Sequence, residues 1–277
     1  MNPDPKILSN LAKTALKNQN KQIAGDWSPP QGPEGKQFVE SIKPEDRDVP
    51  EDSARVFRAV SSNRFHVEAA TNISKKFEGY IDRLCKSIAL GWTTWMAQST
   101  IQGVVIMGPV GTLVPGTVMG PDLGGLILAS NPPVDTPQER ECTTAVARAF
   151  GAGWTEWSSQ LNGTIPCAHC AVFPGPMAPP LPNVPVPVST LISSGATALT
   201  KDRLVAAMNQ NYGGSGTFTE DIFQSVSAAF AQYFPTWQGA TNVVNVLAGG
   251  PIPTFAPPVV PAGPVMGGVG AGAACFL

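Results

Sequence analysis

One pattern of large and small residues occurs three times along the chain, each time ending on a tryptophan. When the chain is aligned on Trp95, Trp157 and Trp237, the positions three, seven and eleven residues earlier are large and apolar in every copy, and the position six residues earlier is small. Such offsets place side chains on one face of an α-helix, so the pattern predicts three helices with equivalent buried faces. The residues expected in this repeated core are Leu84, Ile88, Trp92, Trp95, Val146, Phe150, Trp154, Trp157, Val226, Phe230, Phe234 and Trp237.

Capping signals support two of the three helix starts. Thr136-Pro137-Gln138-Glu139 is a capping box with proline at the first helical position, and Thr217-Phe218-Thr219-Glu220 has the same spacing. The first helix is expected to start near Ser74, where the signal is weaker. Because proline lacks an amide hydrogen and its ring clashes with the preceding turn, Pro235 is expected to kink or end the third helix just before Trp237.

Short runs of β-branched residues and Gly-Pro turns follow the predicted helices. Gly108-Pro109 and Gly250-Pro251 lie at the same distance beyond their tryptophans, and residues 165–179 form the corresponding, more diverged stretch. These features favour short edge-like strands that pair with another copy or another subunit. We therefore predict an α+β fold of three internal helix-plus-β-hairpin repeats, with pseudo-threefold closure or as a short solenoid. The units are expected at about residues 70–130, 136–196 and 217–272.

The charged residues divide the chain into an arm and a domain. Of the 38 charged residues, 26 lie in positions 1–86. A short helix is predicted over residues 4–24, then a proline-rich stretch from Trp27 to Pro33, then a linker in which a helix begins near Asp52. The sequence therefore predicts a charged N-terminal arm at 1–65, either a docking arm or a simple tail, and a triple-repeat domain at 66–277.

The remainder of the chain is unusually poor in charge. Charged residues make up 14% of the sequence, whereas soluble domains contain about 25%. No charged residue follows Asp221, and glycine and proline contribute 28 residues each. This composition indicates surfaces that other subunits or lipid cover. The net charge of −2 and the absence of a basic domain argue against nucleic acid as a partner.

Cys167-Ala168-His169-Cys170 is the cluster that most resembles a metal site, but zinc usually takes four ligands from two such pairs. The other candidate ligands, His66, Cys85, Cys142 and Cys275, are isolated in the sequence. We favour a structural role for Cys167, His169 and Cys170, and leave open a redox pair or a metal shared between subunits. We therefore expect neither a metal site nor a cofactor in this protein.

Catalytic chemistry has little support in the sequence. His66 and His169 are the only histidines, and most carboxylates beyond the arm lie at predicted helix starts, where negative charge stabilises the helix. Asp122 is interpreted as a turn residue. The glycine-rich run at 267–272 lacks the strand-to-helix context of a nucleotide site. We therefore expect that the protein is not an enzyme.

The expected function is that of a non-catalytic structural or assembly protein. A cap, plug, tip or adaptor subunit of a large symmetric particle, such as a phage tail or a tail-like contractile injection system, fits three similar units in one chain. The alternative is a membrane-active effector, or a cargo protein of such a particle. The expected partners are other protein subunits; membrane contact is not favoured, because prolines interrupt the apolar segments every few residues. Without a signal-like segment or a long apolar run, and with an odd number of cysteines, the chain is expected in the cytoplasm until it is assembled.

Overall fold

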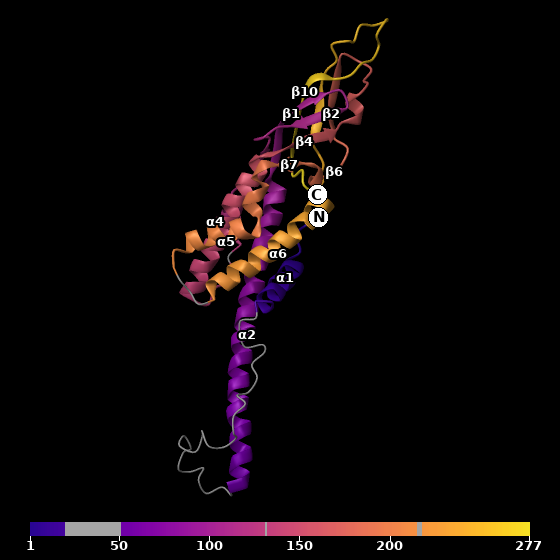
Figure 1. The fold of residues 1–277 in the computed structure, drawn as a ribbon. Helices are drawn as coiled ribbons and strands as arrows, with labels where there is room; N and C mark the ends of the chain where they lie inside the picture. The colour runs from indigo at the N-terminus through magenta and orange to yellow at the C-terminus, as the bar shows by residue number, and fades with distance from the viewer. Residues whose placement is uncertain (20–50, 131, 215–217) are drawn as a thin grey trace. The chain divides into compact units, whose positions relative to one another are not determined.

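The computed structural model describes residues 1–19, 51–130, 132–214 and 218–277; side chains are described from residue 75 onward in the second range, together with Asn72. The chain forms two compact units, one of residues 1–18 with 81–277 and one of residues 19–80. It is a mixed helix-and-sheet, α+β protein (Figure 1). Its helices are α1 (Pro5–Lys17), α2 (Glu51–Gln98), α3 (Leu123–Ala129), α4 (Pro137–Ser159), α5 (Lys201–Tyr212) and α6 (Thr219–Ala240), with short 3-10 helices η2 (Ala168–Cys170), η3 (Val188–Thr190) and η4 (Ser194–Leu199). Its strands are β1 (Thr100–Met107), β2 (Val110–Leu113), β3 (Val118–Met119), β4 (Leu161–Pro166), β5 (Met177–Pro182), β6 (Val186–Pro187), β7 (Ile192–Ser193), β8 (Asn242–Val243), β9 (Leu247–Pro251) and β10 (Met266–Ala273).

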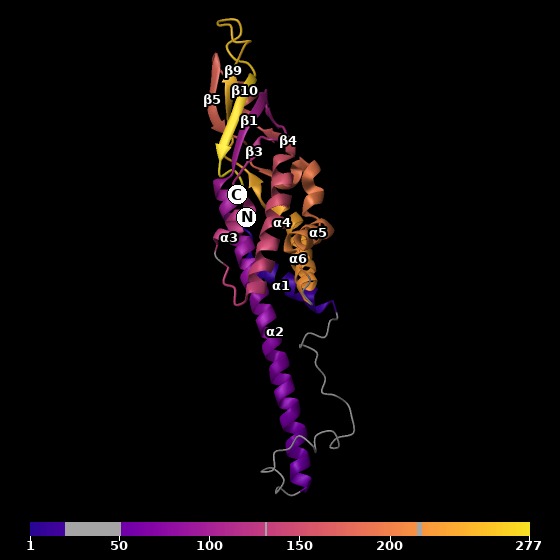
Figure 2. The same ribbon diagram turned by 90° about the vertical axis from the view of Figure 1, so that its left-hand side faces the viewer.

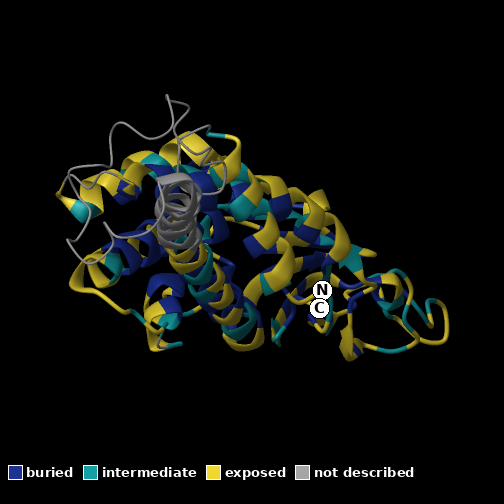
Figure 3. Ribbon diagram, turned by 90° about the horizontal axis from the view of Figure 1, so that it is seen from below, coloured by how far each residue is buried: buried dark blue, intermediate teal, exposed yellow. Residues whose placement is uncertain are grey.

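The core of the larger unit is an aromatic cluster between α2, α4 and α6. The ring centroid of Trp92 lies 5.1 Å from that of Trp154 and 4.7 Å from that of Trp237. All twelve residues of the repeated core pattern are buried, with exposed fractions of at most 7%. Figure 3 shows buried and exposed stretches alternating around the helices, as expected when one face of each helix packs inward.

The start of α4 follows the capping prediction. Thr136 Oγ1 accepts a hydrogen bond from the Glu139 amide at 3.1 Å, and Pro137 is the first helical residue. The second predicted box is different, because α6 begins at Thr219 with Phe218 as its N-cap, and no side-chain hydrogen bond caps it. Thr217 lies outside the described residues.

Two other helix predictions are wrong in part. Helix α2 runs without a break from Glu51, so the helix expected near Asp52 is present and a separate start near Ser74 is not. Helix α6 continues through Pro235 to Ala240. Phe234 and Trp237, on either side of this proline, are both buried, and we infer that their packing offsets the cost of proline in the helix. Within the described residues, no helix combines the length and the apolar character needed to cross a membrane.

The N-terminal helix α1 belongs to the larger unit. Asp4 caps α1, and its own amide donates a hydrogen bond to the Tyr233 hydroxyl of α6 at 3.0 Å. The Lys13 ammonium forms an ion pair with Asp82 of α2 at 2.6 Å. Residues 1–18 therefore pack within this unit instead of extending from it as the first part of an arm. Residues 20–50, which include the proline-rich stretch of the predicted arm, lie outside the described residues.

An antiparallel sheet joins strands from all three predicted units. Its strand order is β5-β9-β10-β1-β2-β4-β7, and β3 also pairs with β1. Strand β1 pairs with β10 from the third predicted unit, and β2 pairs with β4 from the second, so pairing between units occurs as expected. The proline-containing strand β5 lies at an edge of the sheet, in agreement with the effect of proline on strand position.

The strands that follow the three core helices do not take equivalent places. Strand β1 lies near the centre of the large sheet, β4 lies next to its short edge strand β7, and β8 forms a separate two-stranded pair with β6. Figure 2 shows the strands gathered at one end of the larger unit, beyond the helices. The helices thus share one core, whereas the strands that follow them are divided unequally between the large sheet and the separate β6-β8 pair.

The glycine-rich run at 267–272 is strand β10 and not a nucleotide loop. A Cβ atom would lie 2.2 Å from the Gly249 carbonyl oxygen if built on Gly268, and 2.3 Å from that of Asn245 if built on Gly272. Alternate glycines therefore let the neighbouring backbone pack closely against the inner face of this strand.

Candidate interaction surface

One face of the large sheet points away from the core. Side chains alternate between the two faces of a strand, and direct cross-strand partners lie on the same face. Val105 of β1 is the partner of Val269 of β10, and Met107 is the partner of Val110 of β2 and of Met266 of β10. These five apolar side chains therefore extend across three adjacent strands.

The outward side chains are exposed, whereas those that alternate with them are buried. Val104, Ile106 and Ile165 have exposed fractions of 0%. The large apolar residues on the outward side have exposed fractions of 38–64%. We call them the apolar sheet face: Val105, Met107, Val110, Met177, Leu247, Met266 and Val269. Leu247 belongs to it through its partner Ala271 in β10, and Met177 through its partner Pro251 in β9.

The strands that form this surface carry no charged side chain. No strand in the described part of the chain contains Asp, Glu, Lys or Arg. A soluble monomer exposes isolated apolar side chains as a rule, and a contiguous apolar patch usually marks a site of interaction. The surface fits a partner that offers apolar side chains.

The edges of the sheet are poor sites for adding another strand. Strand β5 contains Pro179, Pro180 and Pro182, which have no amide hydrogen to donate, and the opposite edge strand β7 contains two residues. Such edges disfavour pairing with a further chain. The face of the sheet, and not its edge, is therefore the surface suited to docking.

An apolar loop, residues 252–265, connects β9 and β10 at the end of the sheet (Figure 2). Ala256 and Val260 exchange two backbone hydrogen bonds of 2.8 and 2.7 Å, and Val259 between them is 84% exposed. Ile252 and Val265 are buried at the two ends of the loop. The loop contains no charged residue and presents an apolar tip next to the sheet.

The sequence candidates Cys167, His169 and Cys170 lie in and beside η2. Both cysteines are buried, and Cys170 Sγ lies 3.2 Å from His169 Nε2. The same nitrogen lies 2.8 Å from the Ala248 carbonyl oxygen, which can only accept, so Nε2 carries the proton. In the described part of the chain, no three His, Cys, Asp or Glu side chains are arranged to hold a metal ion.

Burial raises the pKa of both thiols in this cluster. The pKa of Cys167 rises to about 11, first because burial disfavours the thiolate and further because of the charge and hydrogen bonding of Cys170. Burial also raises the pKa of Cys170, although a hydrogen bond from Cys167 opposes this change. Both groups are therefore thiols at neutral pH.

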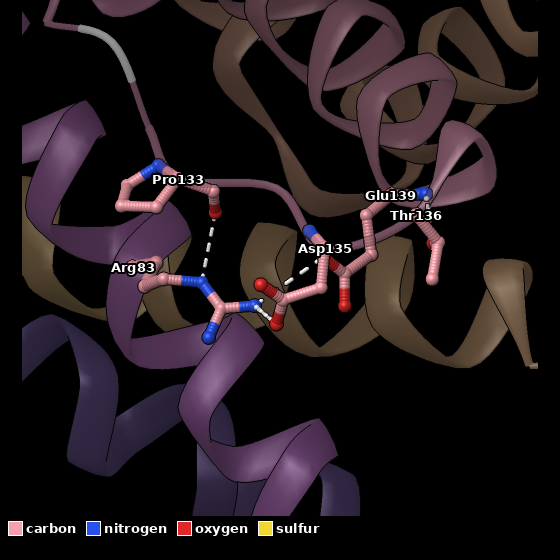
Figure 4. Close-up of polar contacts among 5 residues, drawn as sticks. All are labelled: Arg83, Pro133, Asp135, Thr136 and Glu139. Atoms are coloured by element: carbon pink, nitrogen blue, oxygen red, sulfur yellow. Dashed lines mark hydrogen bonds and ion pairs between the residues drawn. The ribbon is translucent and has the colours of Figure 1, made fainter.

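Several carboxylates hold the fold together. Arg83 of α2 donates from Nε to the Pro133 carbonyl oxygen at 2.8 Å and from Nη2 to Asp135 at 2.9 Å, and Nη2 lies 3.3 Å from Glu139 (Figure 4). These contacts fix the start of α4 against α2. Asp122, expected in a turn, is instead the N-cap of α3, where it accepts hydrogen bonds from the Gly124 and Gly125 amides.

Compared with known protein families, with curated proteins and with solved structures, the chain matches none. The apolar sheet face was not among the residues singled out by the sequence pattern. The sequence feature that could have identified this face is the alternation of inward and outward side chains along β1 and β10. It becomes informative only when the strand register assigns each side chain to one face of the sheet.

Proposed function

We propose that this chain is a non-catalytic structural subunit of a large symmetric protein particle, in which it serves as a cap, plug, tip or adaptor. Phage tails and tail-like contractile injection systems are examples of such particles. The observation that carries the proposal is the apolar sheet face, with seven exposed large side chains on strands that contain no charge. Covering such a surface stabilises an assembly by roughly 25 cal/mol for each Å² of apolar area removed from water.

The arrangement of the core helices supports a role among repeated subunits. Helices α2, α4 and α6 bring the same residue pattern into one cluster, and a strand begins four or five residues after each aligned tryptophan. We infer that the three segments are versions of one helix-plus-hairpin unit whose hairpins later took different places. A chain with internal repeats can present related surfaces to several copies of a symmetric partner. The expected partners are other protein subunits, met in the cytoplasm before or during assembly.

The experiment places a charge on the proposed interface and compares it with the same change elsewhere. Val105 on the sheet face is 46% exposed, and Leu90 on α2 is 47% exposed. The tagged wild-type chain, Val105→Lys and Leu90→Lys are each expressed in the producing cell, and lysates are separated by sedimentation. Both variants should retain the far-ultraviolet circular dichroism of the wild type, because neither side chain is part of the core.

The wild type and Leu90→Lys should sediment with large particles, and Val105→Lys should remain among free proteins. Burying an unpaired ammonium in an apolar interface is strongly unfavourable, whereas a lysine on a solvated helix surface is not. The proposal fails if the wild type sediments only as a small species, or if Val105→Lys enters particles as efficiently as the wild type.

The apolar loop favours one competing function, a membrane-active effector. Its exposed Val259 and its lack of charge suit contact with lipid. Leakage of dye from liposomes on addition of the purified chain, abolished by Val259→Asp, would support that function. Inertness toward lipid together with co-sedimentation would support the structural role. A cargo role is distinguished by its position inside the particle in an electron-microscopy map.

A further inference from the structure

The turn formed by η2 connects three separate parts of the large sheet. The Cys167 amide donates to the Pro109 carbonyl oxygen, in the turn between β1 and β2, at 2.7 Å. The Val265 amide, just before β10, donates to the Cys170 carbonyl oxygen at 2.9 Å. His169 Nε2 donates to Ala248 in β9 at 2.8 Å. The backbone positions of both cysteines are thereby fixed.

The two cysteines are the ends of one tight turn, because the Cys170 amide donates a hydrogen bond to the Cys167 carbonyl oxygen at 2.9 Å. A hydrogen bond from the Cys167 thiol also opposes the rise that burial causes in the Cys170 pKa. Both cysteines have exposed fractions of 0%, and neither is part of a disulfide. Two cysteines at the ends of such a turn have neighbouring backbones, so they can form a disulfide without a large movement of the chain. The role of such a pair is not explained by the apolar sheet face.

We propose that Cys167 and Cys170 form a dithiol that a small hydroperoxide converts reversibly into an intrachain disulfide. In the first step the Cys170 thiolate attacks one peroxide oxygen, the O–O bond breaks, and the other oxygen leaves as an alcohol or as water after taking up a proton. In the second step Cys167 sulfur attacks the Cys170 sulfenic acid, an S–S bond forms, and the sulfenic hydroxyl leaves as water with the Cys167 proton. Two thiols are oxidised by two electrons and one peroxide is reduced.

The surroundings of the sulfurs decide which one attacks and which oxidant reaches them. Burial raises the pKa of Cys170, and a hydrogen bond from the Cys167 thiol opposes this change, so Cys170 is the sulfur whose thiolate is favoured by its neighbour. His169 Nε2 lies 3.2 Å from Cys170 Sγ, but its proton is donated to the Ala248 carbonyl oxygen. Neither sulfur has exposed surface, so a small neutral peroxide can reach them more readily than a bulky disulfide such as oxidised glutathione. Because the thiolate is the reacting form, the rate of oxidation should increase about tenfold for each unit by which the pH rises, as long as the pH stays below the pKa of the attacking thiol.

The test uses the reduced, purified, full-length protein. Hydrogen peroxide is added, the reaction is stopped, the protein is unfolded in iodoacetamide, and peptides are analysed by mass spectrometry. The peptide containing residues 167–170 should lose two hydrogen atoms and escape alkylation, and dithiothreitol should reverse both changes. Cys85 and Cys142 should remain alkylated. Sulfoxide at Met177, which is 64% exposed, reports that the peroxide dose was sufficient.

Two serine variants separate the roles of the sulfurs. Cys167→Ser should leave Cys170 to accumulate as sulfenic and then sulfinic acid, whereas Cys170→Ser should leave Cys167 largely unreacted. Circular dichroism checks that both variants fold, and the wild-type measurement stands without them. The proposal is overturned if both wild-type cysteines remain alkylated at a dose that oxidises Met177, if they form sulfinic acids without a disulfide, or if the rate does not change between pH 7 and pH 8.

Discussion

Replacing Trp157 with alanine should remove a central part of the aromatic core. The Trp157 side chain is 1% exposed, and its ring centroid lies 4.7 Å from that of Trp154 and 5.2 Å from that of Phe234. The ring centroids of Trp95 and Trp237 lie 6.4 and 6.1 Å from that of Trp157. Truncating a buried tryptophan to alanine costs about 3–5 kcal/mol of unfolding free energy.

We expect a value in the upper half of that range, about 4–5 kcal/mol, because each well-packed aromatic pair adds roughly 0.5–1.5 kcal/mol beyond its buried area. In a domain of ordinary stability, about 5–15 kcal/mol, this loss removes between about a third and nearly all of the free energy of unfolding. Urea unfolding followed by far-ultraviolet circular dichroism measures the change without relying on tryptophan emission, and a lower midpoint with an unchanged slope is expected.

Leu90→Ala is the matched control, because Leu90 lies on the outside of the same helix bundle and is 47% exposed. Its effect should stay within about 0.5 kcal/mol. A loss below about 1 kcal/mol for Trp157→Ala would mean that the side chain does not lie in a packed core, and the shared-core arrangement of α2, α4 and α6 would then be refuted.

Two further predictions concern helix contacts in the larger unit. Burial opposes ionisation of Asp82, but hydrogen bonds from Lys13 and Ser9 and the Lys13 charge outweigh it and lower the Asp82 pKa below its ordinary value of 3.8. The contribution of this carboxylate to stability, about 0.2–1 kcal/mol, is therefore complete above pH 3.8 and is lost as the pH falls through the folded pKa. Asp82→Asn should remove this acid dependence in thermal unfolding between about pH 6 and pH 2, and an unchanged acid dependence would contradict the pairing of Asp82 with Lys13. Gly151→Ala should destabilise by about 1–3 kcal/mol in urea unfolding, because its Cβ would lie 2.5 Å from an Asp122 carboxylate oxygen, whereas Gly239→Ala, with no atom within 4 Å of the new Cβ, should be neutral or stabilise by up to about 1 kcal/mol; equal effects would contradict the close packing of α3 on α4.

Local patterns identified the core helices because their determinants lie close together in the sequence. The stripe from Leu84 to Trp95 and the capping box at Thr136 each depend on residues within a few helical turns. Helix α3 was missed because Asp122 and its two glycines resemble a turn. An apolar run directly after Asp122 was the signal for an N-cap.

The sheet could not be predicted in the same way, because its pairing joins distant residues. Strand β1 pairs with β10, so Val105 lies opposite Val269. The sequence of neither strand by itself determines which strand it pairs with or in which register. The contact of Cys167 with Cys170 follows from their spacing, but the segments held by η2 come from three strands and turns that only the folded chain brings together. The hairpins therefore appeared equivalent in sequence although they take different places.

Hydroxyl-radical footprinting of methionines, in the free chain and in the particle fraction, measures whether other subunits cover the apolar sheet face. Met107, Met177 and Met266 lie on the apolar sheet face and are 41–64% exposed, whereas Met96 is 3% exposed. All three should oxidise readily in the free chain. In the particle they should be protected to the level of Met96, while Met1, which is 41% exposed outside the sheet, serves as the reference for dose. Equal oxidation of the three methionines in both samples would contradict the proposal that this face is covered by other subunits.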